Sequence, residues 1–134
     1  MIYAVIDTNV FVSAYLTHNF ESATSKVVTY LLQGKITLLY NDEIMEEYEE
    51  VLSRSHFHIS FSERETLFAY IREKGILTER TTFGDWFVDE DDRVFYEVAL
   101  SEEDSFLVTG NLKHYPIDPR VVTPAQMLEI LEKD

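Results

Sequence analysis

The sequence predicts an α/β domain built as a three-layer α/β/α sandwich, with a central, mostly parallel sheet of four to five strands. The continuous apolar run at 2–6 and the mostly apolar stretches at 36–40 and 105–109 are typical of strands buried on both faces of such a sheet. Segments that carry helix-capping signals separate these runs along the chain. Since the 134 residues contain neither a repeat nor a linker rich in Gly, Pro or Ser, we expect a single domain over 1–134.

The first half of the chain alternates between predicted strands and helices. After the run at 2–6, residues 7–9 supply capping side chains for a helix that starts near Val10. A second helix fits 22–33, with Gly34 as its C-terminal stop. After the run at 36–40, Asn and Asp side chains favour the start of a helix over about 42–54.

The middle of the chain contributes two more helices and an acidic loop. The stretch Ser62-Glu63-Arg64-Glu65 has the pattern of a capping box and predicts a helix that ends at Gly75. A short edge strand is expected within 76–82. The acidic loop DWFVDEDD then leads to a helix from about 93 to 100.

The last part of the chain returns to the sheet. The run at 105–109 reads as a buried strand that ends before Gly110, and 120–123 forms a last short strand. A helix start is predicted at Thr123, which is a typical N-cap residue. Pro124 would then take the first helical position and Gln126 the third. A final helix therefore runs to the C-terminus.

Composition narrows the function classes. The formal net charge of −14 repels nucleic acid, so a phosphate polymer would bind only if a cation, such as a bound divalent metal, lay between. The absence of Cys excludes disulfides, thiolate metal sites and a Cys nucleophile. With neither a signal peptide nor a membrane-spanning apolar run, we expect a soluble, cytoplasmic protein with no membrane partner.

Sheet topology indicates which polar residues belong to a site. In parallel α/β sheets, ligands bind at the carboxyl ends of the strands. Asp7 follows the first predicted strand and Asn111 follows the strand at 105–109, so both are expected at the same sheet edge. Asp7 is read equally well as a helix N-cap, and convergence with other acids is what favours a metal ligand.

Other acids lie on two helices. On the helix over 42–54, Glu47 and Glu49 flank the apolar arc on opposite sides, and periodicity alone does not choose between them. The stretch 85–104 contains nine acids, four of them consecutive at 89–92. One helix cap needs fewer acids than this, and a cation would relieve their repulsion.

Four segments of the chain, in order, resemble the motifs of PIN domains, and in particular the VapC-like toxins of toxin–antitoxin systems. VIDTNVFVSA resembles the first motif and implies that Asp7 binds metal. NDEIMEEYEEVLSR resembles the second, in which a Glu precedes an aromatic residue, and this selects Glu47. DEDDRVFYEVAL resembles the third and implies Asp92 as a metal ligand, with Asp89 as a supporting acid. FLVTGNLKHYP resembles the fourth, where Asn111 replaces the Asp of many PIN domains.

The resemblance implies a Mg²⁺- or Mn²⁺-dependent endoribonuclease that hydrolyses single-stranded RNA. Asp7, Glu47 and Asp92 would hold the ion, and Asn111 would complete the catalytic set. Asn9 and Thr109 would support it. The resemblance also implies a cognate antitoxin protein and a homo-oligomer, a dimer, as partners. From the residues alone, we expect a small basic rim for RNA, made of Arg54, Lys74, Arg80, Arg93 and Lys113.

Two other interpretations stay open. A PIN domain with weakened catalysis would act as an RNA- or protein-binding module, and Asn111 is the residue that favours this reading. A phosphoryl-transfer domain of the receiver or phosphatase type also places acids at strand ends. Such domains need paired acids or an Asp-x-Asp pattern after the first strand, whereas this chain reads Asp-Thr-Asn.

Overall fold

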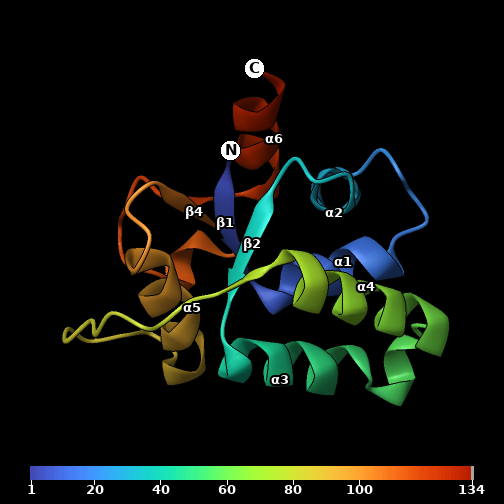
Figure 1. Cartoon of the computed structure of the whole chain (residues 1–134), viewed down its shortest axis with the longest axis horizontal. Coiled ribbons are helices and arrows are strands. Elements are labelled where there is room, and N and C mark those ends of the chain that lie inside the picture. Colours follow the sequence, from blue (N-terminus) through green and yellow to red (C-terminus); the bar gives the residue numbers. More distant parts are fainter. Residues whose placement is uncertain (134) are drawn as a thin grey trace.

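The computed structural model describes residues 1–133 and contains a five-stranded sheet in the order β3-β2-β1-β4-β5, with all strands parallel (Figure 1). This confirms the predicted α/β class and its parallel sheet. The strands are β1 (Tyr3–Ile6), β2 (Thr37–Tyr40), β3 (Ile76–Leu77), β4 (Ser105–Val108) and β5 (Val121–Val122).

Helices cover both faces of this sheet. Helix α5 packs against β1, β2 and β4 on one side, and α1, α2 and α4 lie on the other side (Figure 1). Helix α6 packs against α2. Within residues 1–133, none of the helices combines the length and the apolarity needed to cross a membrane. The helices are α1 (Thr8–Leu16), α2 (Ala23–Leu32), α3 (Asp42–Leu52), α4 (Phe61–Lys74), α5 (Glu90–Leu100) and α6 (Pro124–Glu132), with single-turn helices η1 (Ser55–Phe57) and η2 (Leu112–His114).

Most helix boundaries follow the capping signals of the sequence. Asp7 caps α1, and Asn41 caps α3 by accepting a hydrogen bond from the Ile44 backbone N–H. The capping box predicted for α6 forms between Thr123 and Gln126 in both directions. Local side-chain chemistry therefore sets these starts.

Three helices begin earlier than predicted, the first of them α1, which starts at Thr8 rather than near Val10. Ser60 caps α4, because its hydroxyl accepts from the Glu63 backbone N–H and donates to the Glu63 carboxylate, so Ser62 lies inside the helix. The same Ser-x-x-Glu pattern occurs two residues upstream of the predicted one. Helix α5 begins at Glu90 because Asp89 caps it. The acids that follow Asp89 thus occupy the first turn, where the helix dipole favours negative charge.

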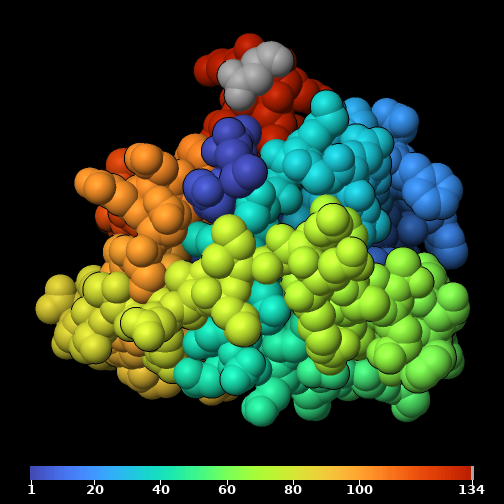
Figure 2. All heavy atoms as spheres, viewed as in Figure 1, coloured from blue at the N-terminus to red at the C-terminus, as the bar shows by residue number. Residues whose placement is uncertain are grey.

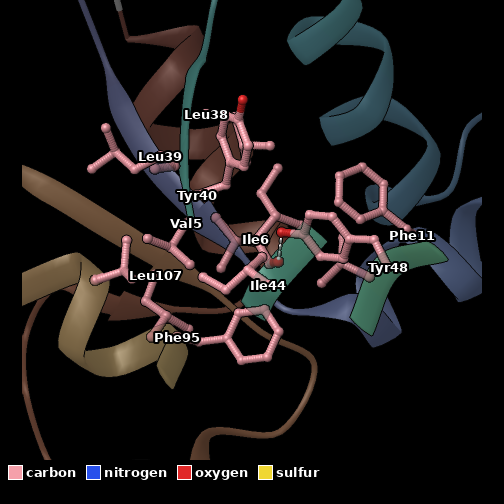
Figure 3. Close-up of a cluster of buried hydrophobic side chains, with 14 of the residues drawn as sticks. Val5, Ile6, Phe11, Leu38, Leu39, Tyr40, Ile44, Tyr48, Phe95 and Leu107 are labelled. Carbon is pink, nitrogen blue, oxygen red and sulfur yellow. Dashed lines mark hydrogen bonds between the residues drawn. The ribbon is translucent and has the colours of Figure 1, made fainter. Parts of the chain in front are cut away.

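The core is centred on β1, whose last three residues are fully buried. In Figure 3, Val5 and Ile6 of β1 lie among side chains from α3, α5, β2 and β4. The Tyr48 hydroxyl of α3 donates a hydrogen bond to the backbone carbonyl of Ile6 (Figure 3). Helix α3 is therefore tied to the end of β1, directly before Asp7.

We expect the hydrogen bond between Tyr48 and Ile6 to stabilise the folded protein. Tyr48→Phe is expected to lower the free energy of unfolding by about 1–2 kcal/mol, because the Ile6 carbonyl loses a buried donor. Urea denaturation measures the loss. Tyr40→Phe is the matched control, since the buried Tyr40 ring has no hydroxyl hydrogen bond with any of residues 1–133. Equal losses in the two variants would contradict the prediction.

Candidate functional site

The strand order places a topological switch point between β1 and β4, and we refer to the region at the carboxyl ends of these two strands as the crevice. From β1 the chain crosses to β2 and β3 on one side, and β4 and β5 lie on the other. In open α/β sheets such a switch of direction leaves a ligand-binding crevice at the carboxyl ends of the strands. Asp7 follows β1 and Thr109 follows β4, and the Asp7 backbone N–H donates to the Val108 carbonyl at 2.9 Å. The two side chains therefore meet in this crevice.

The Asp7 carboxylate is buried and held by several donors. One oxygen, Oδ1, accepts a hydrogen bond from the Asn9 backbone N–H at 3.2 Å and so caps α1. The other oxygen, Oδ2, accepts from Thr109 Oγ1 at 3.0 Å and from the Tyr115 hydroxyl at 2.9 Å. The two readings of Asp7 are thus compatible, because one oxygen serves the cap and the other faces the crevice.

Glu47 lies beside Asp7. The Thr8 hydroxyl donates to the Glu47 carboxylate, and Thr8 is the residue that follows Asp7. Glu49 instead pairs with Arg72 at 2.8 Å on another side of α3. Of the two glutamates that helical periodicity left open, Glu47 is the one at the crevice.

Asp92 reaches the same region from the first turn of α5. Its Oδ2 lies 3.1 Å from Nδ1 of His114, which belongs to η2. Asp89 is exposed and acts as the N-cap of α5, accepting from the Asp91 backbone N–H at 3.0 Å. Asp92 is therefore the half-buried acid of this cluster that faces the loop after β4.

Burial and neighbouring charge raise the pKa of two of these acids, Glu47 and Asp92. Burial raises the pKa of Glu47, the charge of Asp7 adds to the effect, and the hydrogen bond from Thr8 opposes it. The pKa of Asp92 is raised to about 6, first by burial and then by the charge of Asp7. The hydrogen bond and the charge of His114 oppose this rise. Repulsion between acids from three different elements is therefore present in this crevice.

The charges of all three acids raise the pKa of Tyr115. Its phenol pKa lies well above the ordinary value because of burial first, and then because of the charges of Asp7 and Asp92. The charge of Glu47 adds to this effect. Tyr115 therefore stays protonated and acts as a hydrogen-bond donor to Asp7.

The donor set fits a hard divalent cation in chemistry and in charge. Carboxylate oxygens are the ligands that Mg²⁺ and Mn²⁺ prefer, and a cation would relieve the repulsion. Within residues 1–133, however, no group of three or more acidic or histidine side chains is arranged closely enough to hold an ion. Glu47 and Asp92 contact Thr8 and His114 instead.

The remaining predicted residues contribute mainly through the backbone. Asn111 is exposed, and its backbone N–H donates to Thr109 Oγ1 at 3.0 Å. Its side chain does not cap η2. Asn9 is likewise exposed and contacts Asp7 through its backbone N–H. Thr109, buried between Asn111 and Asp7, links these groups.

Four bases of the predicted rim lie next to acids, and the rim itself stays a prediction. Arg80 pairs with Glu43 at 2.9 Å and with Glu97 at 2.7 Å, and Arg93 pairs with Glu90 at 2.7 Å. Arg54 and Lys74 also pair with neighbouring acids. With 25 acids and 11 bases in the chain, most bases find an acid nearby. These four cations are therefore occupied in ion pairs.

Sequence reasoning missed two residues of the site as hydrogen-bond donors. For Thr8 the sequence predicts only a place among the capping residues 7–9, although its position directly after Asp7 was an available signal. Tyr115 had no local signal, because its position depends on the loop after β4. The structure also brings His114 to Asp92.

Comparison with known proteins adds one finding. A protein-family model described as PIN domain matches residues 3–113. This range begins in β1 and ends within η2, so it includes Asp7, Glu47, Asp92 and Asn111 but not His114 or Tyr115. A search of curated proteins finds no match.

Because the pKa of Asp92 is raised in the folded protein, we expect its contribution to stability to depend on pH. In EDTA, Asp92→Asn is expected to raise the free energy of unfolding at pH 7 by about 1–3 kcal/mol, because the folded state disfavours the charged form of Asp92. Between about pH 4 and pH 6 the folded wild-type protein binds more protons than the unfolded chain, so the wild type loses stability as the pH rises through this window. The advantage of the variant should therefore be absent below about pH 4.

Urea denaturation of the wild type and the variant at pH 4 and pH 7 checks this. A variant that is no more stable than the wild type at pH 7 would show that Asp92 carries no such penalty.

Proposed function

The chain belongs to the PIN-domain family, whose members are generally nucleases, and on this premise we propose that it is a metal-dependent endoribonuclease that hydrolyses the phosphodiester bonds of single-stranded RNA. The observation that carries the proposal is that Glu47 and Asp92 lie near enough to Asp7 for its charge to raise the pKa of both. Among residues 1–133, Asp7 and Glu47 form no ion pair, and the ion-pair partner of Asp92 is His114. Three acids left without Lys or Arg favour a site for a metal cation.

In this proposal Asp7, Glu47 and Asp92 would hold Mg²⁺ or Mn²⁺, which when bound polarises a phosphoryl oxygen and lowers the pKa of a water. The chain's own contribution is to orient the carboxylates. Thr109 and Tyr115 hold Asp7 Oδ2, and Thr8 holds Glu47. Asn111 supports Thr109 through its backbone N–H. Such partners of metal-binding side chains fix their orientation and tune affinity.

We extend the proposal to the role of a toxin in a toxin–antitoxin pair that acts in the cytoplasm. The resemblance to VapC-like proteins supports it, and so do exposed apolar side chains such as Phe20 and Ile117, which are suited to a dimer or to an antitoxin protein. Expression in a bacterial host should then arrest growth, and co-expression of a neighbouring reading frame should restore it. Growth arrest that persists with Asp7→Asn would contradict a nuclease toxin.

The nuclease itself is tested with labelled single-stranded RNAs of mixed sequence in Mn²⁺, Mg²⁺ or EDTA. Cleavage is expected with a metal and not in EDTA. Glu47→Gln should reduce the rate by more than about a hundredfold, since changes to partners of metal ligands alone cost ten- to a hundredfold. Glu49→Gln is the matched control on the same helix, because Glu49 pairs with Arg72.

Two outcomes would overturn the proposal. Equal loss in Glu47→Gln and Glu49→Gln would remove Glu47 from the site. Tight Mn²⁺ binding in calorimetry with no cleavage of any RNA would favour the binding module that Asn111 suggests.

A second variant tests the support of Asp7. Tyr115→Phe removes one of the two side-chain donors to Asp7 Oδ2 and is expected to weaken Mn²⁺ affinity about tenfold or more. Calorimetric titration with Mn²⁺ measures the change. Tyr96→Phe is the control, because the Tyr96 hydroxyl donates to Asp118 rather than to a predicted ligand. Unchanged affinity in Tyr115→Phe would remove this hydrogen bond from metal binding.

A further inference from the structure

A small aromatic pocket lies directly beside the carboxylate cluster. It has a volume of about 130 Å³, and its lining is mostly apolar. The segment between β3 and α5 forms one wall and the loop after β4 forms the other. The lining includes Phe83, Trp86, Phe87, Val88, His114 and Tyr115.

Two residues belong to both the pocket and the crevice. The Tyr115 ring lines the pocket while its hydroxyl donates to Asp7 at 2.9 Å. His114 lines the pocket while its Nδ1 lies 3.1 Å from Asp92. A group seated in the pocket is therefore separated from the carboxylates by the thickness of a single side chain.

The inner wall of the pocket is firmly held. The buried Phe87 ring packs edge-on against the rings of Tyr115 and Phe83. The distances between ring centroids are 5.9 Å and 6.0 Å, respectively. The Phe83 backbone N–H donates to the buried Glu97 carboxylate at 2.8 Å. Arg93 donates to the Phe83 carbonyl and lies 5.1 Å from the Phe87 ring centroid. The wall is thus preformed rather than assembled on binding.

The rim of the pocket is open to solvent. Trp86 exposes 80% of its surface and Val88 exposes 52%. They belong to the segment between β3 and α5, which projects at the lower left of the molecule in Figure 2. Exposure of the apolar indole ring to water is unfavourable. We therefore expect an aromatic or apolar ligand to cover this ring.

We propose that this pocket binds one unpaired nucleobase of the nucleic-acid strand whose phosphate lies at the carboxylate cluster, with the base stacked on Trp86. This inference rests on the proposed nuclease function and deepens it. The size of the pocket suits a single ring system rather than a protein segment. Stacking on aromatic side chains is a general means of binding single strands and requires no positive charge.

The charge distribution explains why such a pocket would matter here. Arg54, Lys74, Arg80 and Arg93 are occupied in ion pairs, and the chain carries a net charge of −14. Affinity from phosphate contacts alone is therefore limited. A stacked base supplies affinity that does not depend on cationic side chains, and it holds the strand in register with Asp7, Glu47 and Asp92.

Trp86 itself provides the measurement, because it is the only tryptophan in the 134-residue chain. A short oligoadenylate is titrated into the wild-type protein in EDTA and about 0.15 M salt, which screens repulsion and prevents metal-dependent cleavage. Saturable quenching of Trp86 fluorescence is expected. An abasic ribose-phosphate oligomer of the same length should cause none.

Matched variants provide the second measurement. Trp86→Ala is expected to weaken binding of fluorescein-labelled oligoadenylate about tenfold in fluorescence anisotropy. Phe61→Ala should leave it unchanged, since Phe61 is also well exposed, 69%, but lies at the start of α4. Binding should also fall only weakly with added salt, because stacking does not release counterions.

The results separate this inference from the proposed function. Metal-dependent cleavage of RNA without any quenching of Trp86 would overturn the pocket and leave the nuclease intact. Base-dependent quenching without cleavage would support the pocket and contradict the nuclease. Equal quenching by the abasic oligomer, equal losses in the two variants, or no binding of oligoadenylate would each overturn the pocket.

Discussion

The structure depends on the hydrogen bonds that hold one buried carboxylate, that of Asp7, at the end of the central strand. A buried charge is costly unless hydrogen bonds replace its lost water. Three donors surround Asp7, and they come from the start of α1, the end of β4 and the loop beyond it. The Tyr48 hydroxyl ties α3 to the carbonyl of the preceding residue, Ile6. Four parts of the chain therefore meet where β1 ends.

Acids elsewhere in the crevice increase the electrostatic cost. Glu47 and Asp92 come from α3 and α5, and each has a pKa raised by burial and by the charge of Asp7. The protein has bases that would offset this charge, yet Arg80 and Arg93 pair with acids outside the crevice. Natural proteins tolerate such destabilising arrangements mainly where function needs them. In the proposed function, a bound cation supplies the missing positive charge.

The segment between β3 and α5 joins this site to the rest of the fold. Glu97, a buried acid of α5, accepts from Arg80 and from the Phe83 backbone N–H. These bonds hold a long connection against α5 and bring Phe87 onto Tyr115. The same tyrosine hydroxyl holds Asp7. Carboxylate orientation and pocket shape therefore depend on one another through a single side chain.

The sequence by itself determined the elements and most of their boundaries. Apolar runs and capping residues act over a few positions, so the strands, the Asp7 and Asn41 caps and the Thr123 capping box were predictable. Even the errors were local. Ser60 caps α4 in place of Ser62 because both begin a Ser-x-x-Glu pattern. The meeting of Asp7 with the end of β4 followed from parallel topology.

Only the tertiary structure decided how side chains distant in sequence share this crevice. Helical periodicity left Glu47 and Glu49 equivalent, and the contact with Thr8 on a different helix distinguishes them. The bond between Tyr115 and Asp7 spans more than one hundred positions, and no local pattern encodes it. The aromatic pocket and the ion pairs of Arg80 likewise depend on how loops pack against α5. Propensity and capping operate within one element, whereas a site needs the relative placement of several elements, which packing of the whole core sets.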